Sequence, residues 1–145
     1  MNILFDQEQL LGLLSNLYAL TGIAANILDP QGQDINLFEG HPPFCKAINE
    51  LPEGHARCVA CDAWKVKNYS ASRGFQFYRC HAGICEAVMP LYDKRSPLAY
   101  LVFGCFLDDT PMAEQWERSR ARLDWYPGGA EALKPAFFRF RQYSS

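Results

Sequence analysis

Cysteine carries the most prominent chemistry in this sequence, and four of the six cysteines are spaced like metal ligands. Cys58 and Cys61 form a Cys-x-x-Cys knuckle, with Cys45 before it and Cys80 after it. Such a knuckle presents two soft thiolates at the spacing of neighbouring ligands on a tetrahedral ion, which favours zinc over an iron–sulfur cluster. The spacing therefore predicts a structural zinc site built from Cys45, Cys58, Cys61 and Cys80.

Other roles for the cysteines stay open at this point. His81 or Cys85 can replace one of the four predicted ligands, and the thiols can instead be buried apolar side chains or a reversible thiol switch. Catalysis is not expected, since a nucleophilic cysteine needs a base beside it. Cys80 and His81 are adjacent on a predicted strand and so point to opposite faces. Cys105 lies in an apolar strand and is expected to belong to the core.

The elements that position these residues follow from hydrophobic spacing and turn chemistry. A helix is predicted to begin after Asp6 and to end at Gly22, because Asp6 is a good N-cap and glycine favours helix C-termini. The spacing also predicts a short helix at 44–49, a longer one at 57–71 and another starting with Thr110 as N-cap before Pro111. Strands are predicted at 23–28, 34–38, 75–81, 85–92 and 98–107.

This order of elements predicts an α+β fold. Five strands with a helical excursion after the second indicate a PAS-like, five-stranded antiparallel sheet with a helical insert and flanking N- and C-terminal helices. Such an analogy favours a ligand cavity between the sheet and the helices but does not establish one. A plain α+β domain without a cavity is the alternative. Residues 130–145 are expected to form a terminal helix, interrupted at Pro135, or the start of a linker.

Composition and charge exclude several classes of protein. Fourteen basic and 16 acidic side chains leave a formal charge of -2, whereas a domain that holds nucleic acid through its phosphates is normally basic. No apolar run approaches the ~18 residues that a membrane-spanning helix requires, and the first residues do not resemble a secretory signal. We therefore expect a cytoplasmic protein with reduced cysteines.

Several short motifs together resemble the PocR sensory domain. They are Phe44–Cys45, Arg57–Cys58 followed by Asp62, Tyr78–Gly83 ("YRCHAG") with Glu86 and Pro90 behind it, and "FGC" near the end of the last strand. The resemblance implies a sensory domain at residues 1–129 that binds a small hydrocarbon derivative such as a short diol or alcohol. It also implies a bacterial transcriptional regulator, with DNA bound only through a separate AraC-type helix-turn-helix domain that this chain lacks.

We expect the ligand to bind in the PAS-like cavity and to change the angle of the terminal helices in a homodimer. Small-molecule sites are mostly apolar with a few orienting polar groups. The predicted lining consists of Tyr78, Trp64, Met89, Phe103 and His81. The alternative is a metal- or redox-responsive cysteine switch that needs no organic ligand.

Overall fold

The order of helices and strands confirms the predicted α+β class. The computed structural model describes residues 6–35 and 41–143. The strands form one antiparallel sheet in the order β1-β4-β3-β2. The elements are α1 (Gln7–Thr21), β1 (Ala25–Leu28), α2 (Pro43–Asn49), α3 (Pro52–Tyr69), β2 (Gln76–Arg79), β3 (Cys85–Asp93), β4 (Ser96–Phe106), α4 (Met112–Arg122), a 3-10 turn (Ala130–Leu133) and α5 (Lys134–Phe137).

The sheet differs from the prediction in its second strand. Within the described residues it has four strands rather than five, because residue 34 forms only an isolated antiparallel bridge to Leu28. The rest of the predicted strand at 34–38 lies largely outside the described residues, at 36–38. Asp29 turns the chain before this bridge, since its carboxylate accepts hydrogen bonds from the backbone N–H groups of Gln31 and Gln33.

Helix ends follow local chemistry, with one correction. The Asp6 carboxylate accepts hydrogen bonds from the first turn of α1, and Gly22 ends that helix with a φ of 72°, as predicted. Thr110 is not the N-cap of α4, which begins at Met112 after Pro111. The Thr110 hydroxyl donates instead to the Asp108 carboxylate, so a competing local acceptor displaces the predicted cap.

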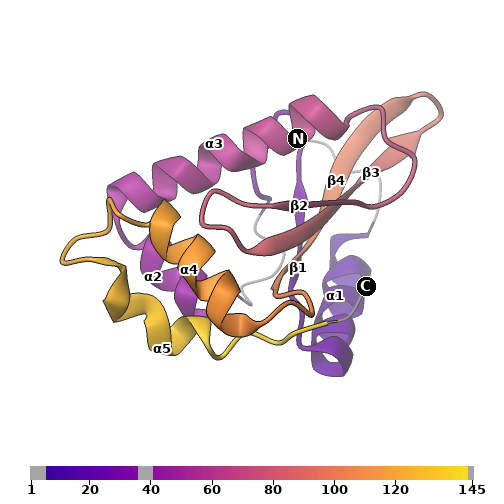
Figure 1. Ribbon diagram of the computed structural model, residues 1–145. Helices are drawn as coiled ribbons and strands as arrows, with labels where there is room; N and C mark the ends of the chain where they lie inside the picture. Colours follow the sequence, from indigo (N-terminus) through magenta and orange to yellow (C-terminus); the bar gives the residue numbers. More distant parts are fainter. Residues whose placement is uncertain (1–5, 36–40, 144–145) are drawn as a thin grey trace.

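Two helices cover opposite faces of the sheet (Figure 1). Val66 of α3 packs against Val88 and Val102 on one face, and Leu14 of α1 packs against Ile27 and Ala99 on the other. This division follows from strand alternation, because neighbouring residues of a strand point to opposite faces. The α3 face lies next to the region where the cysteines gather.

The remaining helices form a third apolar cluster beside the sheet (Figure 1). Phe44 of α2 stacks edge-on against Phe137 and Phe140, and Trp116 of α4 contacts the Phe137 ring. Residues 130–143 therefore pack into the body of the domain as two short helical turns and an extended end, rather than as one long helix. Pro135 stands within the first turn of α5, where proline is tolerated.

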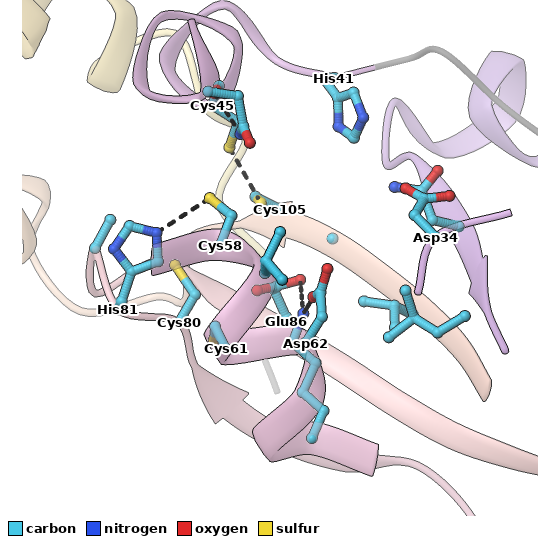
Figure 2. A pocket seen from close by; sticks show the side chains of 18 of the residues that line it. Asp34, His41, Cys45, Cys58, Cys61, Asp62, Cys80, His81, Glu86 and Cys105 are labelled. Carbon is cyan, nitrogen blue, oxygen red and sulfur yellow. Dashed lines mark hydrogen bonds and ion pairs between the residues drawn. The ribbon is translucent and has the colours of Figure 1, made fainter. Parts of the chain in front are cut away.

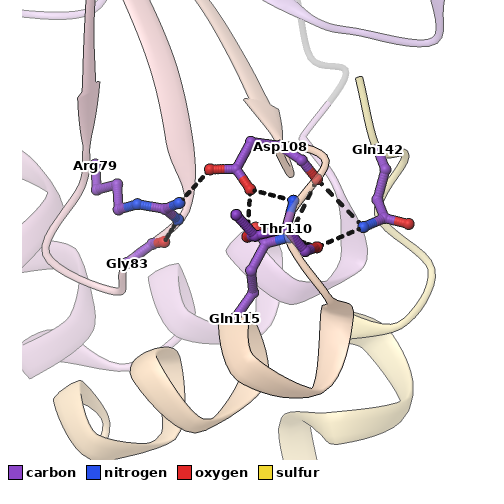
Figure 3. Close-up of polar contacts among 6 residues, drawn as sticks. All are labelled: Arg79, Gly83, Asp108, Thr110, Gln115 and Gln142. Atoms are coloured by element: carbon purple, nitrogen blue, oxygen red, sulfur yellow. Dashed lines mark hydrogen bonds and ion pairs between the residues drawn. The ribbon is translucent and has the colours of Figure 1, made fainter. Parts of the chain in front are cut away.

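A polar network fastens this C-terminal segment to the sheet (Figure 3). The Asp108 carboxylate pairs with the Arg79 guanidinium at 2.5 Å, and Arg79 also donates to the Gly83 carbonyl. The Asp108 carbonyl accepts hydrogen bonds from the amides of Gln115 and Gln142. Asp108 thereby connects the turn after β2, helix α4 and the end of the described chain.

Gly54 offers a test of how tightly α2 and α3 meet. A Cβ at this position would lie 2.0 Å from the Ile48 carbonyl oxygen, which is backbone and cannot swing away. Gly54→Ala should therefore lower the free energy of unfolding by about 2 kcal/mol or more.

Gly12→Ala is the matched control, because nothing lies within 4 Å of its added Cβ on the exposed side of α1. It should stabilise by about 0.5–1 kcal/mol. Urea unfolding measures both, and equal effects would contradict the packing described for α2 and α3.

Candidate ligand cavity and its thiol cluster

A cavity of about 740 Å³ lies between α3, α2 and the sheet. Its apolar wall comes from α2, β1, β4 and the turn before β3, and includes Phe44, Ile48, Leu28, Val102 and Ile84. Its polar groups include Lys65, Asp62, Glu86, His81, Asn49 and five of the six cysteines. This size and mixture match the usual small-molecule site, which is apolar with a few placed polar groups.

A β-bulge shapes one wall of the cavity. Cys85 pairs with Phe106 and Glu86 with Gly104, so Cys105 is the extra residue on β4 and its side chain joins the cavity lining. Gly104 makes room for the neighbouring strand, since an added Cβ would lie 2.9 Å from Glu86 Cγ. The prediction that Cys105 belongs to the core holds in part, since Cys105 packs against the apolar cluster around Phe44 and also lines the cavity. The bulge accounts for its position at the cavity wall.

The thiols in the cavity make pairwise contacts (Figure 2). Cys45 Sγ lies 3.3 Å from Cys105 Sγ, and Cys58 Sγ lies 3.1 Å from His81 Nε2. The sequence placed His81 near the other cysteines only as a substitute ligand in the predicted metal site. The structure instead brings His81 to Cys58, 23 residues earlier, because the turn after β2 packs beside α3.

The four predicted zinc ligands, Cys45, Cys58, Cys61 and Cys80, all line this cavity. Even so, the described residues contain no group of three or more histidine, cysteine, aspartate or glutamate side chains that could hold a metal ion. A tetrahedral site needs four donors around one point, whereas Cys45 contacts Cys105 and Cys58 contacts His81. As the structure places them, these side chains do not surround one point, and zinc binding stays a prediction.

Burial keeps the cavity thiols protonated. It raises the pKa of Cys58 to about 12, with a partial offset from a hydrogen bond to the Asn49 side chain. Burial also raises the pKa of Cys61 and holds that of Cys80 well above its ordinary value. Because the thiolate is the nucleophile and the form that oxidises, these cysteines resist nonspecific oxidation at neutral pH.

A buried charge cluster forms the polar side of the cavity. Lys65 is 3% exposed, and its ammonium lies 2.6 Å from Asp62 Oδ1 and 3.1 Å from Glu86 Oε2. Burial lowers the pKa of Lys65, but the two carboxylates outweigh burial and the net pKa is well above the ordinary value. Two carboxylates around one ammonium leave the cluster with an excess negative charge.

The predicted ligand-binding residues are distributed over several places. His81 lines the cavity. Tyr78 packs outside it, under the Lys65 ammonium and against Trp64 and Tyr69. Trp64 is 48% exposed and borders a separate shallow depression.

Met89 and Phe103 do not face the cavity. Phe103 packs with the α1 cluster, and Met89 pairs with Leu101, which packs with the same cluster. Val88 and Val102, one residue earlier on each strand, face α3 instead. The prediction placed Met89 and Phe103 on the wrong face of the sheet, because strand alternation separates them from the α3 side.

Sequence reasoning missed Lys65, Glu86 and Asn49 as cavity residues. A signal was available for α3: Cys58, Cys61, Asp62 and Lys65 follow the i, i+3, i+4, i+7 spacing of one helix face. That face is polar, so a search for apolar stripes passes over it. Glu86 entered the sequence analysis only as part of the family motif, and its place in an otherwise apolar strand did not indicate its partner.

Comparison with known proteins bears on this site. The family model described as "Sensory domain found in PocR" matches residues 3–134. This chain belongs to the PocR sensory domain family. The regulatory protein PocR of Salmonella typhimurium (strain LT2) is 32% identical over 86 residues, which is 58% of this chain and 28% of that protein. The chain thus spans well under half the length of this relative. No solved structure matches the present chain.

The motifs that carry the family resemblance converge on the cavity of this PocR domain. Cys45, Cys58, Asp62, Cys80 and His81 all line it, although they come from α2, α3 and the turn after β2. Within the described residues, no helix is long and apolar enough to span a membrane.

The charge cluster gives a stability prediction. Lys65→Met leaves Glu86 buried without its cation and should lower the free energy of unfolding by about 3–5 kcal/mol. Lys67→Met, at an exposed position on the same helix, should change it by no more than about 0.5 kcal/mol. Chemical denaturation of both variants measures the difference. Similar values for the two would show that the cluster contributes no net stability.

His81 gives a pH prediction. Burial, and then the positive charge of Arg57, lower the pKa of His81 below its ordinary 6.5. As the pH falls, His81 is therefore protonated in the unfolded chain before it is protonated in the folded domain. The free energy of unfolding keeps the full contribution of His81 above pH ~6.5 and loses it as the pH drops toward the pKa of His81 in the folded domain. His81→Asn should flatten this fall between about pH 7 and pH 5, measured by thermal unfolding. Asp108, whose pKa is lowered, affects stability only at lower pH, below its ordinary pKa of 3.8.

Proposed function

We propose that this PocR domain is the ligand-binding module of a bacterial transcriptional regulator and that it senses a small, uncharged hydrocarbon derivative. The observation that carries the proposal is the cavity of about 740 Å³ with the Lys65–Asp62–Glu86 cluster on one side. Family membership supports the sensory role. Turnover of the ligand forms no part of the proposal.

The chemistry of the cavity restricts the ligand. Apolar side chains such as Ile48 and Ile84 favour a hydrocarbon body. The excess negative charge around Lys65 repels carboxylate ligands and offers carboxylate oxygens to hydroxyl donors, which suits alcohols and diols. Because a small ligand contributes about -0.3 to -1.5 kcal/mol per heavy atom, the affinity should be modest.

Ligand binding is proposed to act on the rest of the regulator through the C-terminal segment. His81 borders the cavity, and Arg79, two residues earlier, holds the Asp108 network to which Gln142 is attached. A homodimer and a separate helix-turn-helix domain complete the proposed regulator. A PAS-like sheet belongs to the same proposal.

Blocking the cavity mouth tests the proposal. Val59 lines the cavity yet is 52% exposed, so Val59→Trp can fill the opening with little disturbance of the core. The wild type should gain about 2.7 kcal/mol of stability at a diol or alcohol concentration about a hundredfold above Kd, and Val59→Trp should lose this gain. Ala56→Trp, at an exposed position on α3 that does not line the cavity, is the control. A ligand shift that survives in Val59→Trp would place binding elsewhere.

A further inference from the structure

The proposed noncovalent binding of an alcohol gives no role to the contact between Cys58 and His81, although both residues line the cavity (Figure 2). Cys58 lies on α3 and His81 in the turn between β2 and β3, and the two meet with Sγ 3.1 Å from Nε2. Among the cavity cysteines, Cys45 contacts another thiol instead. A thiol within hydrogen-bond distance of an imidazole can pass its proton to that base as the sulfur attacks, even where the resting thiol is protonated.

The surroundings of the pair suit addition better than turnover. His81 Nδ1 is buried and has no hydrogen-bond partner among the described residues, so no third group orients the imidazole as catalytic triads require. The Asn49 side chain lies beside Cys58 and lines the same cavity. Its amide can donate to an oxygen that forms next to the sulfur. The uncharged imidazole leaves a nitrogen free to accept the thiol proton.

We propose that Cys58 captures a small aldehyde as a reversible hemithioacetal, with His81 as the proton carrier. This inference rests on the proposed function, since the aldehyde occupies the same cavity. The Cys58 S–H proton moves to His81 Nε2 while sulfur bonds to the carbonyl carbon. The C=O π pair moves to oxygen, which takes the proton back from His81. The product is a sulfur-bound carbon bearing one hydroxyl, and no oxidant or reductant is consumed.

The cavity favours aldehydes over other electrophiles on two grounds. Its apolar wall takes the hydrocarbon chain. The Asn49 amide can donate a hydrogen bond to the new hydroxyl, and the nearby carboxylates can accept one from it. A sensor must also release its ligand when the concentration falls. Addition to an aldehyde reverses by the same proton transfers, whereas alkylation of a thiol does not.

Butanal labelled at its carbonyl carbon is the probe, with butanol as the matched compound that cannot form the adduct. Carbon NMR on the wild-type domain should show a hemithioacetal resonance separate from free aldehyde and hydrate.

Cys58→Ser should lose the resonance and weaken apparent butanal affinity about tenfold or more. Cys85→Ser, which removes a buried thiol outside the cavity, should keep both. His81→Asn should slow adduct formation about 100-fold. Cooperative thermal unfolding confirms that each variant is folded.

Three results would overturn the inference. They are a hemithioacetal signal that persists in Cys58→Ser, equal butanal affinity in wild type and Cys58→Ser, and a stoichiometric metal in the purified wild type that is lost in Cys58→Ser. Butanol binding without a butanal adduct removes this inference alone and leaves the proposed function standing. If neither compound stabilises the wild type at any concentration tested, the proposed function fails with it.

Discussion

The ion pair between Lys65 and Glu86 is the contact on which the arrangement of this domain depends. It joins α3 to β3 across the cavity, and both side chains are buried. A charge taken out of water costs several kcal/mol unless it is closely paired, so each group holds the other in place. Asp62, one turn before Lys65 on the same helix, is the second partner of the ammonium, and the contact of Lys65 with Glu86 fixes the rotation of α3 against the sheet. That rotation in turn sets Cys58 and Cys61 toward the cavity.

The sheet accommodates this contact through a local irregularity. Glu86 stands opposite Gly104, and the bulge at Cys105 lets β4 bend away as it passes the carboxylate. A side chain at position 104 would meet Glu86 at 2.9 Å. The same bulge carries Cys105 to within 3.3 Å of Cys45. One glycine thus permits both the buried ion pair and the contact between α2 and β4.

How far the sequence predicts this structure depends on whether a feature is local. Asp6 and Gly22 mark the ends of α1 by local capping, and alternation along 75–107 correctly predicts three strands. The motif residues Cys45, Cys58, Cys80 and His81 all line one cavity, whereas the metal site that their spacing indicated stays a prediction. The face assignment of Met89 and Phe103 failed, because local spacing does not show which helix covers which face of the sheet. The bulge that brings Cys105 to the cavity wall is likewise absent from local spacing. The Cys58–His81 contact joins residues 23 apart, which spacing alone does not reveal.

The position of His81 ties the cavity to the end of the described chain. The turn that carries His81 contacts α3 through Cys58. The Arg79 guanidinium, just before this turn, binds both the Gly83 carbonyl within it and the Asp108 carboxylate. Asp108 holds Gln142 through its carbonyl, and Tyr143 donates to the Thr21 carbonyl at the end of α1. A ligand can shift these contacts only if it binds two arrangements of the turn with different affinity. Bonding to Cys58 would meet that condition directly, because it replaces the thiol hydrogen and so changes the Cys58–His81 contact that holds the turn to α3.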